Sequence, residues 1–292
     1  MATAFVLSGG ASLGAVQVGM LGAIAERGIA PDLLVGTSAG ALNAGYLAGH
    51  GAQPDAIAGL GALWRSLRTW QLFRPDPRRA VNTLLGRGTA VFGAQGLHEL
   101  LDRHLTFSRL EDAGIALQVI ATDLLTGEEV ALDSGPAAAA ILASSAIPGM
   151  LPPVTCGERT LVDGGLADNA AISRAVQAGA GTIYVLPCGY PCALTSPPRS
   201  ALGTLTQAMA LLVHQRLLHD ITLYASEADL IVLPPPCPLS VNPMDFGHAD
   251  ELIRRAHTEA AKFLAVDGGR REDPAAHIRM HTHATAVTVV SR

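Results

Sequence analysis

Ser38 lies in a stretch whose residue types and spacing suit covalent catalysis. Residues 36–40 read G-T-S-A-G, a match to G-x-S-x-G. This pattern is typical of a nucleophile elbow, a sharp strand-to-helix turn that exposes a serine hydroxyl. Gly36 and Gly40 flank the serine because side chains there would collide in so tight a turn. We therefore predict that Ser38 is a nucleophile at a helix N-terminus, where the helix dipole favours developing negative charge. On the motif alone, a βα turn with a capping serine remains an open alternative.

A glycine-rich loop is the second candidate for chemistry. Gly9, Gly10 and Ala11 follow a short apolar strand, as the serine follows the next strand, and Gly14 ends the loop. Adjacent parallel strands would bring both loops to the same edge of a sheet. The backbone N–H groups of Gly9, Gly10 and Ala11 could then form an oxyanion hole, a set of donors that stabilises the negative oxygen formed during acyl transfer.

An acidic residue completes the set. Asp163 follows the apolar run at 160–162 and is itself followed by Gly164 and Gly165. Two glycines allow the backbone to turn sharply and to pack close to the elbow. A carboxylate held there could serve as the base that a serine nucleophile needs.

The elements that would position these residues alternate between strand and helix. This order predicts an α/β fold with a mainly parallel central sheet flanked by helices in three layers. We expect strands over 4–8, 32–36, 117–121, 130–132, 160–162, 182–187 and 229–233. We expect helices over 15–27, 39–48, 55–68, 96–105, 136–146, 171–178, 200–219 and 248–266, with an irregular segment over 69–94.

The domain organisation follows from the same pass along the chain. We expect one domain over 4–266 and a polar tail over 267–292 that leaves the fold, with weak strand-like alternation over 284–290. His277, His281 and His283 fall in this tail, where a solvated role is favoured over metal binding.

Composition excludes several classes of protein. The 292 residues are 49% hydrophobic and 15% charged, and the mean hydropathy is +0.32, yet no run of 18 apolar residues predicts a transmembrane helix. A net charge of −5 argues against a nucleic-acid partner. Lys262 is the only lysine, which excludes a P-loop lysine elsewhere. The first 25 residues carry no charged side chain and so lack the basic start of a secretory signal. We expect a cytoplasmic protein, peripheral at most at a membrane.

The four cysteines are too few for a disulfide scaffold in a chain of this length. Cys188 and Cys192 are separated by three residues, rather than by the two of a redox or zinc pair. We therefore expect these cysteines to have neither a metal-binding nor a redox role.

Residues 60–93 differ from the rest in charge. Six arginines and one aspartate, Asp76, give this segment a charge of about +5 in a protein of net charge −5. It also contains Trp64, Trp70, Phe73 and Phe92. Aromatic residues mixed with cations suit an anionic lipid interface. A mobile lid packed on its own domain is the alternative.

The three motifs, in this order, resemble those of the patatin-like phospholipases, which are serine lipid acyl hydrolases. The resemblance runs from about residue 4 to about residue 187 and includes S-S-A-I-P-G at 144–149 and D-G-G-L-A-D-N at 163–169. It implies a Ser-Asp dyad without a histidine, with Ser38 as nucleophile, Asp163 as base and the Gly9-Gly10 loop as oxyanion hole. It also implies a lipid ester as substrate and no cofactor.

The chain departs from the family pattern within this loop. The family loop usually reads G-G-G-x-[KR]-G, whereas this sequence has Ala11 for the third glycine and Leu13 for the basic residue. A backbone donor survives at Ala11 if φ is negative there. Leu13 removes the cation that would contact a phosphate or a carboxylate.

Other functions remain possible on the sequence. A Ser-His-Asp α/β-hydrolase could use His214, His219 or His248, although such folds normally build several strands before the elbow. A nucleotide-binding loop over 9–14 lacks the G-x-G-x-x-G pattern. An acyltransferase, or a lipid-binding protein with an inactive site, would keep the same fold.

Overall fold

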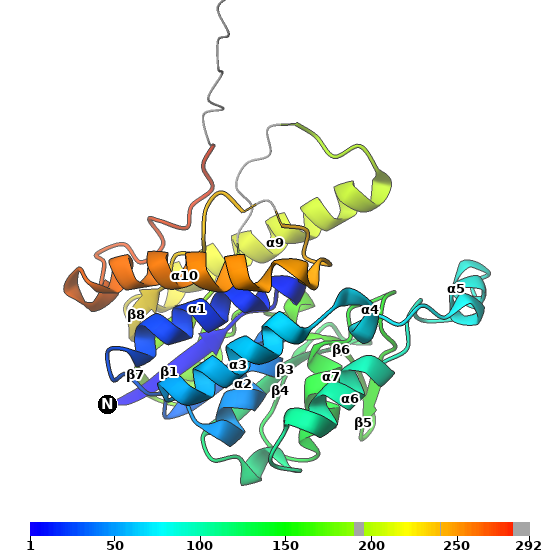
Figure 1. Ribbon diagram of the computed structural model, residues 1–292, viewed down its shortest axis with the longest axis horizontal. Coiled ribbons are helices and arrows are strands. Elements are labelled where there is room, and N and C mark those ends of the chain that lie inside the picture. Colours follow the sequence, from blue (N-terminus) through cyan, green and yellow to red (C-terminus); the bar gives the residue numbers. More distant parts are fainter. Residues whose placement is uncertain (190–195, 240, 283–292) are drawn as a thin grey trace, which may run out of the picture.

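The protein is built around one sheet, seen in a computed structural model that describes residues 1–189, 196–239 and 241–282. The strand order is β5-β6-β3-β2-β1-β7-β8, and β4 pairs with β3 (Figure 1). The strands are β1 (Ala2–Leu7), β2 (Leu33–Thr37), β3 (Ala116–Asp123), β4 (Glu129–Leu132), β5 (Val154–Cys156), β6 (Arg159–Asp163), β7 (Ala180–Leu186) and β8 (Asp229–Val232).

The centre of the sheet is parallel. β1 pairs in parallel with both β2 and β7, β2 with β3, and β7 with β8. The antiparallel strands β4, β5 and β6 lie beyond or beside β3. The prediction of a mainly parallel α/β sheet is confirmed, and β1 and β2, which carry the two glycine-containing loops, are its neighbouring central strands.

Successive side chains of β1 point to opposite faces of the sheet and belong to two different hydrophobic clusters. Phe5 and Leu7 join the cluster that packs under α1 and α2, whereas Ala4 and Val6 join the cluster under α8 and α9. Both faces of the central strands are therefore buried, as expected for a parallel sheet covered by helices on each side. The longer helices are α1 (Gly14–Ala25), α2 (Ala39–His50), α3 (Pro54–Ser66), α6 (Gln95–His104), α9 (Ala201–Tyr224) and α10 (Ala249–Leu264).

Short helices complete the fold and correct one expectation. The segment 69–94 is not irregular throughout: it contains α4 (Thr69–Leu72) and α5 (Pro77–Leu84). Asp76 caps α5 by accepting hydrogen bonds from two of its first amides, a signal that the prolines on either side obscured. The remaining short helices are α7 (Ala137–Ser144) and α8 (Ile172–Gln177).

The residues after α10 pack on the sheet, contrary to the expectation that the chain leaves the fold at Asp267. Ala275 and Ile278 are buried in the core under α9, and His277 Nε2 donates a hydrogen bond to Val232 O at 2.7 Å. The sequence did not predict this packing because Ala275 and Ile278 lie three positions apart within an otherwise polar stretch. The expected alternation over 284–290 lies outside the described residues.

Within the described residues, no helix combines the length and apolarity needed to cross a bilayer. The longest, α9, has 24 residues but remains part of the globular fold through Leu217 and Ile221 in the core.

Gly40 provides a test of the packing between α2 and β1. A Cβ at this position would lie 2.1 Å from the carbonyl oxygen of Leu7. We expect Gly40→Ala to lower the free energy of unfolding by about 3 kcal/mol or more, because backbone must move to accommodate the methyl group. Chemical denaturation measures this loss.

Gly22→Ala is the matched control, since Gly22 is also helical but would place its Cβ 3.2 Å from a side chain, that of His257. Its free energy of unfolding should be unchanged or higher by up to about 1 kcal/mol, because alanine favours helix. Equal losses in the two variants would contradict the proposed role of the contact with Leu7.

Candidate active site

Ser38 occupies a strained turn between β2 and α2. Its φ is 53° and its ψ is −119°, a region that residues other than glycine rarely adopt. The Ser38 N–H donates a 2.8 Å hydrogen bond to Ser144 Oγ, and the Ser38 carbonyl accepts from the amides of Ala41 and Leu42. These contacts hold the backbone in the strained conformation and turn the side chain toward a cavity.

Gly36, Gly40 and Gly164 allow close approach rather than unusual dihedral angles, since none of these three has a φ in the left-handed region. A Cβ on Gly36 would lie 2.7 Å from Ala41 Cα, and one on Gly164 would lie 2.2 Å from Ile120 O. Side chains would therefore collide with backbone at Gly36, before Ser38, and at Gly164, after Asp163.

The sheet register brings Asp163 to Ser38. Thr37, the last residue of β2, pairs with Ile120 of β3, and the next residue, Ala121, pairs with Asp163 of β6. Ser38 Oγ donates a 2.6 Å hydrogen bond to Asp163 Oδ2 across 125 residues of sequence. Asp163 Oδ1 accepts from the Gly165 N–H at 2.8 Å, which orients the carboxyl group.

Burial sets the electrostatics of this pair. Ser38 is 6% exposed and Asp163 is 8% exposed. Desolvation raises the pKa of Asp163 to about 6, although the hydrogen bonds from Ser38 and Gly165 act in the opposite direction. An ionised Asp163 at neutral pH is therefore a stronger base than an exposed aspartate.

The glycine-rich loop lies beside the serine, and its three amides differ. Gly9 would bring a Cβ within 3.1 Å of Ser38 Cβ, but its N–H already donates to Asn169, at 3.2 Å to the backbone O and 3.1 Å to Oδ1. Within the described part of the chain, the amides of Gly10 and Ala11 have no acceptor. The loop therefore has two free donors instead of the three that we expected.

Ala11 does not have the negative φ that would make the change from glycine neutral. Its φ is +50°, in the left-handed region, which costs alanine about 1 kcal/mol relative to glycine. Ala11 therefore adopts a backbone conformation that glycine would adopt at lower cost. Leu13, where the family has a basic residue, is half-buried and packs against the core.

Two residues whose roles the sequence did not reveal support the site. Asn169 clamps the loop: besides accepting from the Gly9 N–H, it donates from Nδ2 to Gly9 O at 3.3 Å. Ser144 accepts from the Ser38 N–H and donates to Ile120 O. Both lie in segments that carry the family resemblance, and this resemblance was the only indication in the sequence that they support the site.

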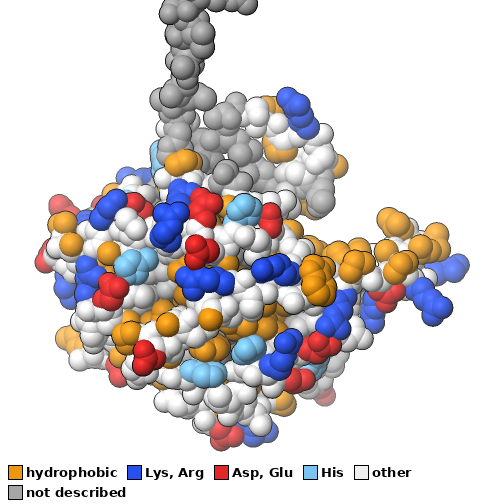
Figure 2. Space-filling model, in the orientation of Figure 1, with side chains coloured by type: hydrophobic (Ala, Val, Ile, Leu, Met, Phe, Trp, Pro, Cys, Tyr) orange, Lys and Arg blue, Asp and Glu red, His pale blue; other side chains and the backbone are white. Residues whose placement is uncertain are grey.

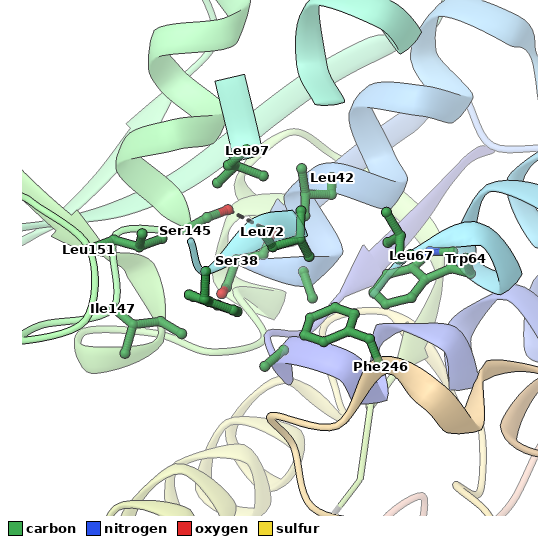
Figure 3. Close-up of a pocket in the computed structure, with 13 residues that line it drawn as sticks. Ser38, Leu42, Trp64, Leu67, Leu72, Leu97, Ser145, Ile147, Leu151 and Phe246 are labelled. Atoms are coloured by element: carbon green, nitrogen blue, oxygen red, sulfur yellow. Dashed lines mark hydrogen bonds between the residues drawn. The ribbon is translucent and has the colours of Figure 1, made fainter. Parts of the chain in front are cut away.

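An apolar cavity opens beside Ser38 (Figure 3). Its free volume of about 40 Å³ is about that of one or two water molecules. Ser145, which donates to Ser38 O at 3.4 Å, is one of its few polar neighbours. The remaining lining residues include Ala11, Leu42, Trp64, Leu67, Leu72, Phe73, Leu97, Ile147, Leu151 and Phe246. Side chains must move before an acyl chain can enter.

The histidines of the alternative triad lie elsewhere. His214 and His219 belong to α9, whose core residues lie on the sheet face opposite α2. His248 precedes α10 and contacts Asp245 at 3.2 Å. None of these three lines the cavity in the described part of the chain. No cluster of metal-ligating side chains occurs among the described residues, and His283 and Cys192 fall outside them.

The segment 60–93 divides into a packed part and an exposed part. Trp64 and Phe73 are buried and line the cavity, so they are not free to contact lipid. Arg65 pairs with Asp250, and Arg74 forms a two-pronged contact with Glu99. The exposed part is centred on α5.

Burial of Asp163 predicts a pH-dependent stability. Its folded-state pKa, about 6, lies above the ordinary value of 3.8, so folding is favoured below pH 4 and this contribution is lost as the pH rises through 6. Asp163→Asn has no such cost. We expect it to be more stable than the wild type at pH 8 by about 3 kcal/mol, a gain that vanishes near pH 4. Urea denaturation at the two pH values measures the difference, and a constant difference would contradict the burial argument.

The chain is similar in sequence to proteins of a known family. The family model for patatin-like phospholipases matches residues 5–176. A patatin-like phospholipase domain-containing protein of Caenorhabditis elegans is 30% identical over 202 residues, which cover 64% of this chain and 13% of that protein. A lysophospholipase of Kluyveromyces lactis is 26% identical over 197 residues, with the same two coverages of 64% and 13%.

The chain thus matches about an eighth of the length of these two relatives. Among solved structures, VipD from Legionella pneumophila aligns with 90% of this chain and 67% of its own, at 15% identity and a TM-score of 0.46. The family match covers more than half of the chain and contains Ser38 and Asp163. The protein belongs to the patatin-like phospholipase family.

Proposed function

We propose that this protein hydrolyses carboxylic esters of lipids through an acyl-Ser38 intermediate. The observation that carries the proposal is the 2.6 Å hydrogen bond from Ser38 Oγ to the buried Asp163 carboxylate, at the edge of an apolar cavity. A nucleophile in contact with its base, beside an apolar cavity that an acyl chain could enter once the lining side chains move, suits acyl transfer. The lysophospholipase among the relatives supports a phospholipid ester as substrate.

In the first step, Asp163 Oδ2 takes the proton of Ser38 Oγ as the oxygen attacks the ester carbonyl carbon. The bond between Oγ and carbon forms, and the carbonyl electrons move to the oxygen. The amides of Gly10 and Ala11 donate to this oxyanion, and Ala11 lines the same cavity as Ser38. Asp163 then returns the proton to the leaving alcohol as the carbon–oxygen bond of the ester breaks.

In the second step, water attacks the acyl-Ser38 carbonyl and Asp163 takes its proton. Collapse of the second oxyanion releases the fatty acid, and the proton on Asp163 returns to Ser38 Oγ. The two steps use the same base and the same donors, so no third side chain has to titrate. Gly165 keeps the carboxylate oriented in both steps through its hydrogen bond to Oδ1.

An acyltransferase would use the same site, with an alcohol in place of water in the second step. A binding protein with an inactive site is the other alternative, and the strained backbone of Ser38 speaks against it, because strain of this kind is retained at functional sites. Contact with a lipid surface through residues 60–93 belongs to the same proposal, because the substrate of a lipid hydrolase resides in an interface.

Substitutions of Ser38 and Asp163 test the dyad. We expect Ser38→Ala and Asp163→Asn each to lower kcat on a soluble short-chain ester by about 10⁴-fold, and the double variant to lose little more, because the two residues act as a unit. A fluorophosphonate should label wild-type Ser38, as peptide mass spectrometry would show.

The controls replace the three histidines of which a Ser-His-Asp triad would need one: His214→Gln, His219→Gln and His248→Gln. They should retain most of the activity. Loss of activity in a folded histidine variant, together with an active Asp163→Asn, would replace the dyad by a triad. An unlabelled Ser38 would favour the binding protein.

The pH dependence of kcat/KM reports the protonation of the base. Because the ionised carboxylate is the active form, kcat/KM should rise with pH and level off above an apparent pKa of about 6, the value of the buried Asp163. Initial rates on a neutral ester between pH 4.5 and 8.5 give the profile. A midpoint near 4, that of an exposed aspartate, would contradict the role of burial.

A further inference from the structure

We infer that the projecting segment 74–92, termed the arm, inserts into anionic lipid surfaces and fixes the protein there with its cavity next to the bilayer. This inference rests on the proposed function and narrows the lipid contact from the whole of residues 60–93 to one structural unit. Its centre is α5, which extends away from the body of the protein (Figure 1).

Large apolar side chains of the arm face solvent. Leu84 is 86% exposed, Leu85 is 62% exposed and Val81 is 53% exposed, and α5 has no buried residue. Figure 2 shows hydrophobic side chains gathered along the projecting arm. Three large exposed apolar residues within five positions are unusual on a surface that contacts only water, and they indicate an interaction site.

The two sides of α5 differ in polarity. At about 100° per residue, Ala80, Val81, Leu84 and Leu85 lie on one side of the helix. Arg78, Arg79, Asn82 and Thr83 lie on the other side and line a polar hollow that the returning chain closes, where Thr83 Oγ1 donates to Ala90 O at 2.8 Å. The polar side of α5 therefore faces the arm itself, and the apolar side is presented outward. This is the arrangement of a helix that lies in a lipid interface.

The charge of the arm matches an anionic surface. Four arginines and one aspartate give the arm a charge of +3, so the rest of the chain carries −8 of the total of −5. Arg79 lies 3.5 Å from Asp76, whereas neither Arg78 nor Arg87 has a carboxylate within ion-pair distance among the described residues. Such arginines attract a membrane surface by about 1 kcal/mol each, about fivefold in affinity. The anionic surface would repel the acidic remainder of the protein, so that the protein binds with its arm toward the membrane.

The base of the arm is joined to the rim of the cavity. The Val91 and Phe92 amides donate to Gly149 O at 3.0 Å and to Met150 O at 2.9 Å. The flanking residues Ile147 and Leu151 line the cavity beside Ser38. Phe92 also packs edge-on against Phe73, another lining residue, with ring centroids 5.6 Å apart. An arm inserted in lipid therefore holds the mouth of the cavity at the interface from which the substrate comes.

Vesicle flotation with the full chain tests the inference. The probes are vesicles of phosphatidylcholine alone and with about 30% phosphatidylglycerol, and all proteins carry Ser38→Ala so that turnover does not alter the lipid. Binding should require the anionic lipid and should weaken as salt rises from about 0.1 to about 0.5 M. Leu84→Asp/Leu85→Asp should bind at least tenfold more weakly, and Arg78→Gln/Arg87→Gln about 25-fold more weakly.

The controls match these changes in chemistry. Val266→Asp alters another apolar residue, 61% exposed, and Arg103→Gln/Arg254→Gln removes two exposed arginines from α6 and α10. Both controls should bind like the parent. Equal binding by the arm variants and the controls would overturn the inference. So would an arm-dependent dimer, seen by light scattering, without vesicle binding.

Hydrolysis of a soluble ester separates this inference from the proposed function. With Ser38 restored, the arm variants should hydrolyse a soluble short-chain ester at the wild-type rate and lose activity only on vesicles, because the arm does not touch the dyad. An inactive wild type that still binds vesicles through the arm would refute the proposed function and leave the arm as a membrane anchor. An active protein whose arm variants bind vesicles normally would refute the arm alone.

Discussion

The close contact between the start of α2 and the end of β1 is the constraint on which the site depends. Gly40 approaches the carbonyl oxygen of Leu7 so closely that no side chain fits between them. This contact fixes the direction of α2, and the turn before it leaves Ser38 only a strained conformation. Because Leu7 leads directly into the glycine-rich loop, the same contact sets the distance between the serine and the loop amides.

In the proposed dyad, burial of Asp163 both raises the pKa of its carboxyl group and destabilises its ionised form. An aspartate beside an apolar cavity loses hydration, which raises its pKa and makes it a better proton acceptor. The hydrogen bonds from Ser38 and Gly165 offset part of this loss. The side-chain polar groups of the site are thus few, and the Ser38 hydroxyl and both oxygens of Asp163 have defined partners, while the apolar cavity lowers the local dielectric around them.

Sequence reasoning predicted the layers of the fold, and its three motifs contain residues that the structure brings together. These features come from local pattern: apolar strands, a glycine on each side of Ser38, and an acid before Gly164. It missed features that depend on distant parts of the chain. The Gly9 amide is occupied because Asn169 lies 160 residues away in sequence but adjacent in space. Likewise, Ile278 is core only because it packs with buried residues of β8 and α9. The outward apolar face of α5 becomes visible only once its neighbours are known.

The distance along the chain between the parts of the site has a consequence for biosynthesis. Ser38 and Asp163 are separated by 125 residues, and Gly9 and Asn169 by 160. Contacts between such distant residues require the closure of long loops, which makes them slow to form during folding. A nascent chain that has emerged only as far as α7 therefore contains Ser38 but neither Asp163 nor Asn169. On the function proposed above, a chain released before β6 joins the sheet could not attack lipid.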